Sequence, residues 1–165
     1  MNYALRALGS RAQASGELRD KLLRRASRRE DVDAVMQKLK DAGYLNDRSF
    51  AEGYAAARLE NEGHGRARVL RDLRQHRVAP KLAEQAVERT FAGTDELELI
   101  DQFLKRKFRG KNLPAWLAEE KNLAGAYRRL CYAGFSSSNS IRVLKRYASR
   151  AEELENLGEI PETEI

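Results

Sequence analysis

The sequence has 165 residues, of which 34% are charged and three are proline, a composition typical of a largely helical protein. No apolar run approaches the roughly 20 residues that cross a bilayer, and no signal-peptide core opens the chain, so we expect a cytoplasmic protein. The single cysteine, Cys131, cannot form an internal disulfide, and with only two histidines beside it the chain cannot build a structural zinc site.

The net charge of +6 combines a basic body with an acidic tail. Residues 1–150 carry 31 Lys and Arg against 19 Asp and Glu, a net charge of +12, whereas residues 151–165 carry 6 acidic residues and no basic ones. A basic body favours a polyanionic or acidic protein partner, because its field raises encounter rates. The tail either folds back over a basic face or serves only as a solubilising segment, and the sequence leaves both readings open.

The N-terminal part of the chain shows three amphipathic segments. The first covers about residues 3–12. The second follows Ser15, whose hydroxyl is a candidate helix cap, and the third follows a capping box formed by Ser27 and Glu30. Gly43 can adopt the left-handed conformation that ends this third helix.

Three further helices are predicted in the middle of the chain. The fourth covers about residues 47–60, and Asn46 or Asp47 is its cap. A fifth begins near Arg66 and a sixth near Pro80, since proline suits the first turn of a helix.

The last part of the chain predicts three more helices and a tail. The seventh helix ends in the basic run 105–111, which the negative end of the helix dipole favours. An eighth begins near Trp116 with an interruption near Gly125, and a ninth follows the candidate caps in residues 136–140. Beyond Arg150 few apolar anchors occur, so we expect a flexible acidic tail.

A distant internal repeat emerges when the second helix of each triplet is aligned. Leu22, Leu73 and Leu130 then coincide, with separations of 51 and 57 residues. Three helices alone bury little apolar surface, so stacking against a neighbour should stabilise each unit. We therefore expect an all-α fold of three tandem three-helix, helix-turn-helix-like repeats that form an elongated, curved body. The predicted repeats are residues 1–45, 46–93 and 94–150, and the tail is residues 151–165.

Four motifs lie on these helices in a fixed order. They are Glu17-Leu18-Arg19-Asp20-Lys21-Leu22, then Gly43-Tyr44-Leu45-Asn46-Asp47 with Phe50-Ala51, then Gly65-Arg66-Ala67-Arg68-Val69 leading to Leu73-Arg74, and finally Leu130 with Gly134-Phe135-Ser136. With these motifs the sequence resembles the RecX family of bacterial recombinase regulators over about residues 3–147. Ala26 and Arg77 stand where that family usually has glycine at a helix turn, so we expect these two joints to be shaped differently.

The resemblance implies a non-enzymatic modulator of the RecA recombinase. Proteins of this family bind along the deep groove of the RecA filament on DNA, contact neighbouring protomers, and limit strand exchange by blocking filament growth or favouring disassembly. The RecA filament is therefore the expected partner, with single- or double-stranded DNA as a second one, because some members bind DNA. We expect no cofactor, no membrane contact and a monomeric chain.

The basic helix faces are the candidate binding surface, and no catalytic or metal-ligating residue is predicted. Their side chains would meet acidic protein groups or phosphates through charge-assisted hydrogen bonds, whereas the alternative is that they form ordinary solvated faces. The candidates are Arg19, Lys21, Arg24, Arg25, Arg66, Arg68, Arg71, Arg74, Arg128, Arg129, Arg142, Lys145 and Arg146.

Other residues with chemical potential favour structural roles. Cys131 is expected to be a buried thiol, and His64 and His76 to be structural or solvated. No glycine-rich phosphate loop, metal-ligand cluster or serine elbow occurs, which argues against an enzyme. Helical spacing favours core packing over base stacking for four aromatic residues: Tyr54, Trp116, Tyr127 and Phe135.

Two alternatives to a recombinase regulator remain open. One is a helix-turn-helix DNA-binding protein that acts independently of a recombinase, although the third, sixth and ninth helices offer few base-reading side chains beyond Arg142. The other is a helical adaptor for a different acidic protein.

Overall fold

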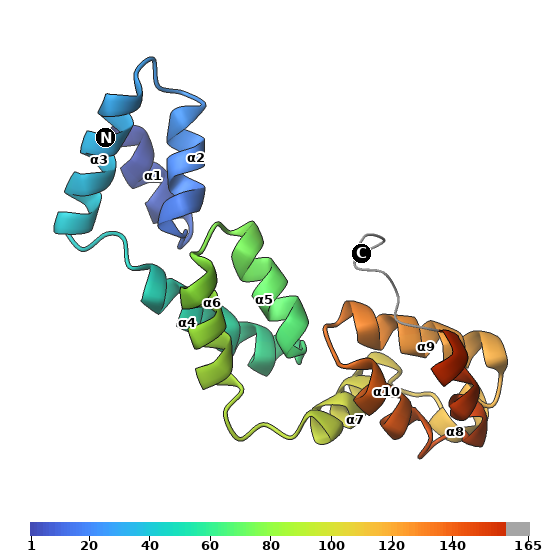
Figure 1. The fold of residues 1–165 in the computed structure, drawn as a ribbon. Helices are drawn as coiled ribbons and strands as arrows, with labels where there is room; N and C mark the ends of the chain where they lie inside the picture. The colour runs from blue at the N-terminus through green and yellow to red at the C-terminus, as the bar shows by residue number, and fades with distance from the viewer. Residues whose placement is uncertain (158–165) are drawn as a thin grey trace. The chain divides into compact units, whose positions relative to one another are not determined.

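A computed structural model describes residues 1–157, and every regular element within that range is a helix (Figure 1). The all-α prediction is confirmed. In chain order the elements are α1 (Asn2–Ser10), α2 (Ser15–Leu23), α3 (Arg29–Asp41), α4 (Asp47–Ala57), the π-helical turn η1 (Arg58–Glu62), α5 (Arg66–Gln75), α6 (Pro80–Thr90), α7 (Glu96–Lys107), α8 (Leu113–Leu117), α9 (Glu120–Tyr132), α10 (Ser137–Leu144) and the 3-10 helix η2 (Ser149–Leu157).

The described chain divides into two compact units. Unit 1 consists of Met1–Ala57 and Leu70–Thr90, and unit 2 consists of Arg58–Val69 and residues 91–157. The division passes through α5, which gives its first turn to unit 2 and the remainder to unit 1. The predicted partition into three repeats and the predicted curvature of the whole body stay predictions.

Each unit contains a buried apolar cluster, as amphipathic helices require. Burying one leucine side chain fully contributes about 1.5–3 kcal/mol, so each cluster is a main source of stability. In unit 1, α4 and α6 also pack against each other, and each buries two alanines. The unit 1 cluster contains Ala4, Leu18, Leu22, Val32, Met36, Leu39 and Leu45. The unit 2 cluster includes Ile100, Leu104, Leu117, Leu130 and Leu144.

The cap of α2 differs from the predicted one, whereas the cap of α4 is Asn46, one of the two predicted candidates. Ser15 does not cap α2, because it is the first helical residue and Ala14 is the N-cap. Instead, the Ser15 backbone N–H donates to Asp47 Oδ1 at 2.6 Å. Asn46 supplies the cap of α4, since its Oδ1 accepts from the Ser49 backbone N–H at 3.0 Å. Asp47 therefore satisfies a donor at the start of a helix far away in the sequence.

The predicted capping box at Ser27 and Glu30 is wrong. The third helix begins at Arg29, with Arg28 as an N-cap that makes no side-chain capping bond. Ser27 thus stands one residue too early to reach the first turn. Arg28 instead pairs with Asp31 at 3.3 Å.

The predicted eighth helix is two helices, and its break is not at Gly125. Helix α8 starts with Asn112, whose Oδ1 accepts from the Ala115 backbone N–H at 3.2 Å, and it lasts little more than one turn. A new N-cap at Glu119 then begins α9, and Gly125 lies inside that helix. Glycine is tolerated in a helix interior at a cost of about 1 kcal/mol, so its presence alone did not mark a break.

The start of the predicted flexible tail is ordered in the structure. Residues Ser149–Leu157 form η2, and the side chains of Ala151 and Leu154 are buried in the unit 2 cluster. The structure thus has a short helix, with Ala151 and Leu154 buried, at the start of the segment for which a flexible tail was predicted. Residues 158–165 lie outside the described part of the chain.

The joints at Ala26 and Arg77, where the family usually has glycine, behave differently from each other. Arg77 has φ of 61°, and the Val78 backbone N–H donates to the Leu73 carbonyl at 3.1 Å. Gly43 and Gly134 end their helices in the same way. The turn at Arg77 therefore has the same backbone conformation as the turns that contain glycine, which differs from the prediction. The left-handed conformation of a residue that carries a Cβ lowers the stability of the fold by about 1 kcal/mol. Ala26 is not among the described residues with positive φ, so that joint differs as predicted.

Two helix starts pack closely against helix turns, and we call these places the first and second turn contacts. In the first, a Cβ added to Gly16 at the start of α2 would lie 2.5 Å from the Arg77 carbonyl oxygen. In the second, the Gly65 backbone N–H before α5 donates to the Ala133 carbonyl at 2.7 Å, and a Cβ added to Gly134 would lie 2.5 Å from Arg68 Cβ. The first lies within unit 1 and the second within unit 2.

Candidate binding surfaces

The predicted basic residues fall into two groups by exposure. An exposed basic side chain can contact a binding partner, whereas a partly buried one usually interacts with other residues of the same chain. The exposed group is Arg24, Arg25, Arg66, Arg74, Arg128, Arg129, Arg142 and Arg146. The partly buried group is Arg19, Lys21, Arg68, Arg71 and Lys145.

Several candidates already form ion pairs within the chain. Arg19 on α2 lies 2.6 Å from Asp33 on α3. Lys145 lies 3.6 Å from Glu152, which comes from the acidic segment. Each ion pair offsets a positive charge that a partner could otherwise contact. We therefore expect these two cations to contribute less to binding than unpaired ones.

Three of the exposed arginines lie against aromatic rings, and one of them is Arg129, whose guanidinium is 5.9 Å from the Phe108 ring centroid. The Arg25 guanidinium lies 4.3 Å from the centroid of the Tyr3 ring. The Arg66 guanidinium lies 5.4 Å from the Phe91 ring and donates to the Phe91 carbonyl at 2.9 Å. Stacking of this kind orients the charged fork and restricts its motion.

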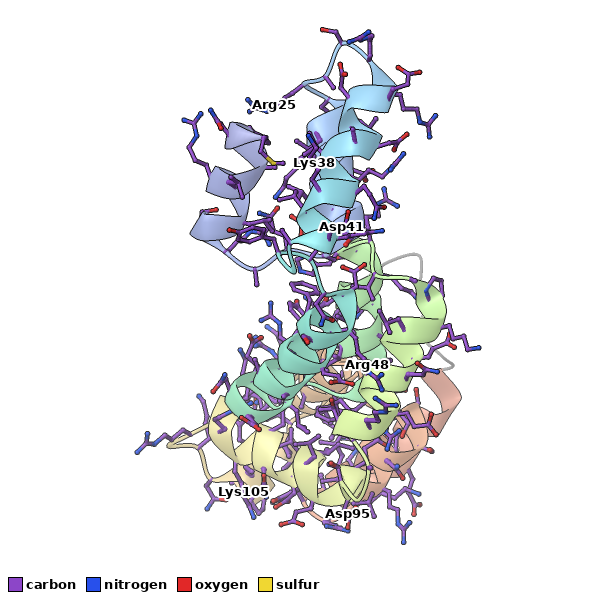
Figure 2. The ribbon with its side chains drawn as sticks, turned by 90° about the vertical axis from the view of Figure 1, so that its left-hand side faces the viewer. Arg25, Lys38, Asp41, Arg48, Asp95 and Lys105 are labelled. Atoms are coloured by element: carbon purple, nitrogen blue, oxygen red, sulfur yellow. The ribbon has the colours of Figure 1, made fainter. Side chains whose placement is uncertain are left out.

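The freest cations of the predicted set lie just after α2, on α9, on α10 and just after α10. Arg24, Arg128, Arg142 and Arg146 are exposed and form no ion pair with the side chains of residues 1–154. Basic side chains also project from helices outside the predicted set, among them Lys38 on α3 and Lys105 on α7 (Figure 2). The basic surface is therefore wider than the predicted set.

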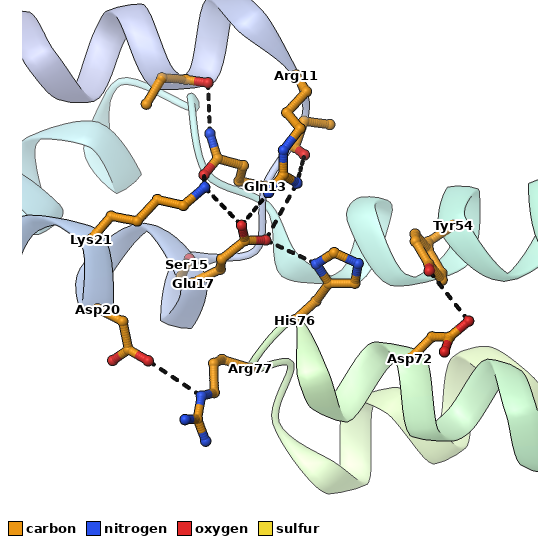
Figure 3. Close-up of polar contacts among 12 residues, drawn as sticks. Arg11, Gln13, Ser15, Glu17, Asp20, Lys21, Tyr54, Asp72, His76 and Arg77 are labelled. Carbon is orange, nitrogen blue, oxygen red and sulfur yellow. Dashed lines mark hydrogen bonds and ion pairs between the residues drawn. The ribbon is translucent and has the colours of Figure 1, made fainter. Parts of the chain in front are cut away.

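A polar cluster around Glu17 was not predicted (Figure 3). Lys21 Nζ lies 2.7 Å from Glu17 Oε1, His76 Nδ1 donates to Glu17 Oε2 at 2.8 Å, and Arg11 pairs with the same carboxylate. Burial raises the pKa of Glu17, but the hydrogen bonds from Lys21, His76 and Arg11 outweigh it and lower that pKa to about 2. Lys21 is therefore engaged within the fold, and its predicted role as a binding residue stays a prediction.

Aromatic rings hold His76 beside this cluster. Its ring meets the Phe50 ring edge-on at a centroid distance of 5.6 Å and the Tyr54 ring at 5.0 Å. Tyr54 in turn donates to Asp72 at 3.4 Å. The prediction of a structural role for His76 agrees with these contacts, but its partner lies 59 residues away in sequence and no local signal indicates it.

Cys131 is half buried beside the unit 2 cluster. Burial raises the pKa of its thiol, against the hydrogen bonds of Tyr127 and Ser137, so the reactive thiolate is disfavoured. Within residues 1–157, no three His, Cys, Asp or Glu side chains gather as a metal site would need. None of the described helices has the length and apolarity to cross a membrane.

Comparison with known proteins places the chain in a family. Residues 46–87 match the model of the second three-helix domain of RecX. The regulatory protein RecX of Trichlorobacter lovleyi is 32% identical over 132 residues, which are 78% of this chain and 84% of that protein. The chain belongs to the RecX family.

Further relatives extend this result. The regulatory protein RecX of Deinococcus radiodurans is 34% identical over 136 residues, which are 82% of this chain but only 62% of that longer relative. The crystal structure of RecX from Lactobacillus salivarius has the same fold, with a TM-score of 0.62 at 18% identity over 88% of this chain and 92% of that one. The predicted membership of the RecX family is thus confirmed.

Proposed function

We propose that this RecX-family chain binds the RecA recombinase filament on DNA and inhibits its ATPase and strand-exchange activities. The observation that carries the proposal is membership of a family of regulatory proteins, together with exposed arginines on helices of both units. On this proposal the chain is a regulator and not an enzyme, needs no cofactor, and acts as a monomer in the cytoplasm, where the filament assembles.

The exposed arginines occur in both units, which suggests how such a chain would bind a polymeric filament. Arg24 and Arg25 lie in unit 1, whereas Arg128, Arg142 and Arg146 lie in unit 2. Each group alone would bind weakly, but linked contacts gain from a high effective concentration once the first is made. A bound chain that engages more than one protomer would block filament extension or promote disassembly.

The direct experiment measures ATP hydrolysis by RecA on single-stranded DNA as this protein is added. We expect inhibition at less than one copy per RecA protomer, because one bound chain affects several protomers. Strand exchange should fall over the same range. Absence of an effect at a stoichiometric excess would overturn the proposal.

A pair of charge-matched variants tests whether the α10 face is responsible. Arg142→Glu with Arg146→Glu reverses two exposed cations on or next to α10, and Lys38→Glu with Lys40→Glu reverses two on α3. We expect the first variant to need roughly tenfold more protein for half-inhibition, since losing an important charged contact costs on the order of 1–2 kcal/mol. If the two variants lose potency equally, only net charge matters and the α10 face has no special role.

A footprint experiment separates the proposal from an independent DNA-binding protein. Protection of a defined duplex sequence in the absence of RecA would favour the helix-turn-helix alternative. We expect no such sequence-specific protection, because α3, α6 and α10 carry few side chains that read base edges.

A further inference from the structure

Two aromatic rings and a set of cations meet beside the end of α7. The Phe108 and Trp116 ring centroids are 4.4 Å apart, and both side chains pack with one part against the unit 2 cluster while remaining partly exposed. Lys111 Nζ lies 5.7 Å from the Trp116 ring, and the Arg129 guanidinium lies 5.9 Å from the Phe108 ring. Helical spacing predicts core packing for Trp116, and the helix dipole accounts for basic residues at the end of α7, so neither feature predicts a binding site.

Some basic side chains of the run 105–111 form ion pairs or hydrogen bonds with other described residues of the chain, and others do not. Lys105 pairs with Asp101 at 2.5 Å, and Arg106 donates to backbone carbonyls of η1. Lys107, Arg109 and Lys111 are exposed and make no ion pair with any described residue. The helix dipole accounts for cations in the last turn of α7, which ends at Lys107, but not for the two that follow it.

We define the aromatic-basic patch as Lys107, Phe108, Arg109, Lys111, Trp116 and Arg129. We infer that this patch binds single-stranded nucleic acid, with a base stacked on the exposed part of the Phe108–Trp116 pair and neighbouring phosphates on the surrounding cations. Partly exposed rings bordered by unpaired cations are what base stacking with phosphate contacts requires. A duplex hides its base faces, so it offers only the charge contacts.

An acidic protein segment fits the same patch less well. Such a partner would use the cations but would gain nothing specific from the two rings. The inference extends the proposed function, in which the filament carries DNA, and its test omits RecA so that the two can fail separately.

Trp116 is the single tryptophan of the chain, so its fluorescence reports on the patch directly. The experiment titrates the full-length protein with an oligothymidylate of about 15 nucleotides, a typical length for a single-strand site. Parallel titrations use a duplex of the same length, inorganic polyphosphate and polyglutamate. We expect saturable quenching of Trp116 by the single strand and weaker binding, with little quenching, of the other three.

Matched variants connect the binding to the named side chains. Arg109→Ala with Lys111→Ala removes two cations of the patch, whereas Lys38→Ala with Lys40→Ala removes two exposed cations of α3. We expect the first to weaken binding about tenfold at moderate salt and to reduce the log–log salt slope by roughly 1.4, at 0.7 per lost phosphate contact. The second should leave both within about twofold.

A second pair of variants isolates stacking and is followed by anisotropy of a labelled oligonucleotide. Trp116→Ala should lose about tenfold in affinity, and Trp116→Phe should retain most of it because a ring is kept. Circular dichroism checks that each variant is folded, and the Arg109 and Lys111 variant decides the matter if Trp116→Ala unfolds. Unchanged Trp116 emission on binding, equal affinity for the duplex, or equal affinity for polyglutamate would each overturn the inference.

Discussion

At the first turn contact the start of α2 meets a turn built by Arg77, and at the second the start of α5 meets a turn built by Gly134. Each turn contains one of these two residues with a positive φ angle. In each contact the helix start and the turn lie too close together for Cβ atoms on both facing residues. The first contact has one glycine, Gly16 at the helix start, which makes room for Arg77. The second has two: a Cβ added to Gly65 before the helix would lie 2.3 Å from the Gly134 carbonyl oxygen, and a Cβ added to Gly134 would lie 2.5 Å from Arg68 Cβ. The first contact therefore accommodates a side chain in its turn, at Arg77, whereas the second has glycine both before the helix and in the turn.

The two contacts also differ in the bonds that hold them. The second uses backbone hydrogen bonds, from Gly65 N–H to the Ala133 carbonyl and from Ala67 N–H to the Gly134 carbonyl at 3.3 Å. The first is held by side chains, chiefly the Glu17 carboxylate and His76. Backbone bonds do not titrate, whereas a carboxylate does, so only the first contact should respond to acid.

The largest effect is expected from Gly134→Ala. The new Cβ would sit at φ of 88° and within 3.0 Å of Arg68, so strain and overpacking add. We expect a loss of about 3 kcal/mol in the free energy of unfolding and a fall in Tm of roughly 6–12 °C, measured by thermal and denaturant melts.

Gly125→Ala is the matched control for this change. Gly125 lies inside α9 with nothing within 4 Å of an added Cβ, so alanine should stabilise the protein by up to about 1 kcal/mol. Equal destabilisation by both substitutions would show that the crowding at Gly134 does not matter.

A smaller effect is expected from Gly16→Ala. An added Cβ would lie 2.5 Å from the Arg77 carbonyl oxygen and 2.6 Å from Arg77 Cβ, which should cost about 2 kcal/mol. Adding Arg77→Gly removes the clash with Arg77 Cβ, so we expect a coupling energy of about 1 kcal/mol in a double-mutant cycle, apart from the strain relief that Arg77→Gly gives by itself. Strict additivity of the two changes would contradict a direct steric coupling.

The smallest effect is expected from Glu17→Gln and depends on pH. The Glu17 pKa is about 2 in the fold against an ordinary 4.5, so its ionised form stabilises the fold above pH 4.5 and this stability is lost as pH falls through 2. We expect the variant to be about 1–2 kcal/mol less stable at pH 7 and to converge with the parent as pH approaches 2. Melts across this range check it, and a constant difference at every pH would rule out the carboxylate as the cause.

Hydrophobic periodicity was enough to predict most of the helices, because residues such as Leu18, Leu22 and Leu39 mark one face of each cylinder. It failed where short elements depend on a few contacts. Helix α8 is little more than one turn, and η2 buries Ala151 and Leu154 in the unit 2 cluster. Neither has enough residues to produce a periodic signal.

The candidate site was predictable in its residue types but not in its pairing. Exposed Arg142 and Arg146 agree with the predicted outward spacing, whereas the engagement of Lys21 by Glu17 depends on a fold that brings His76 to the same carboxylate. The aromatic-basic patch was missed for a similar reason. Its Phe108–Trp116 contact depends on the tight turn between α7 and α8, which charge and spacing do not determine.

The central claim is that this chain is a ligand of the RecA filament, and co-sedimentation with RecA filaments on single-stranded DNA tests it most directly. The protein should pellet with filaments and saturate below one copy per RecA protomer, and binding should survive salt concentrations at which the protein no longer pellets with DNA alone. If it pellets equally with bare DNA and with filaments at every salt concentration, or stays in the supernatant with filaments, the claim is contradicted.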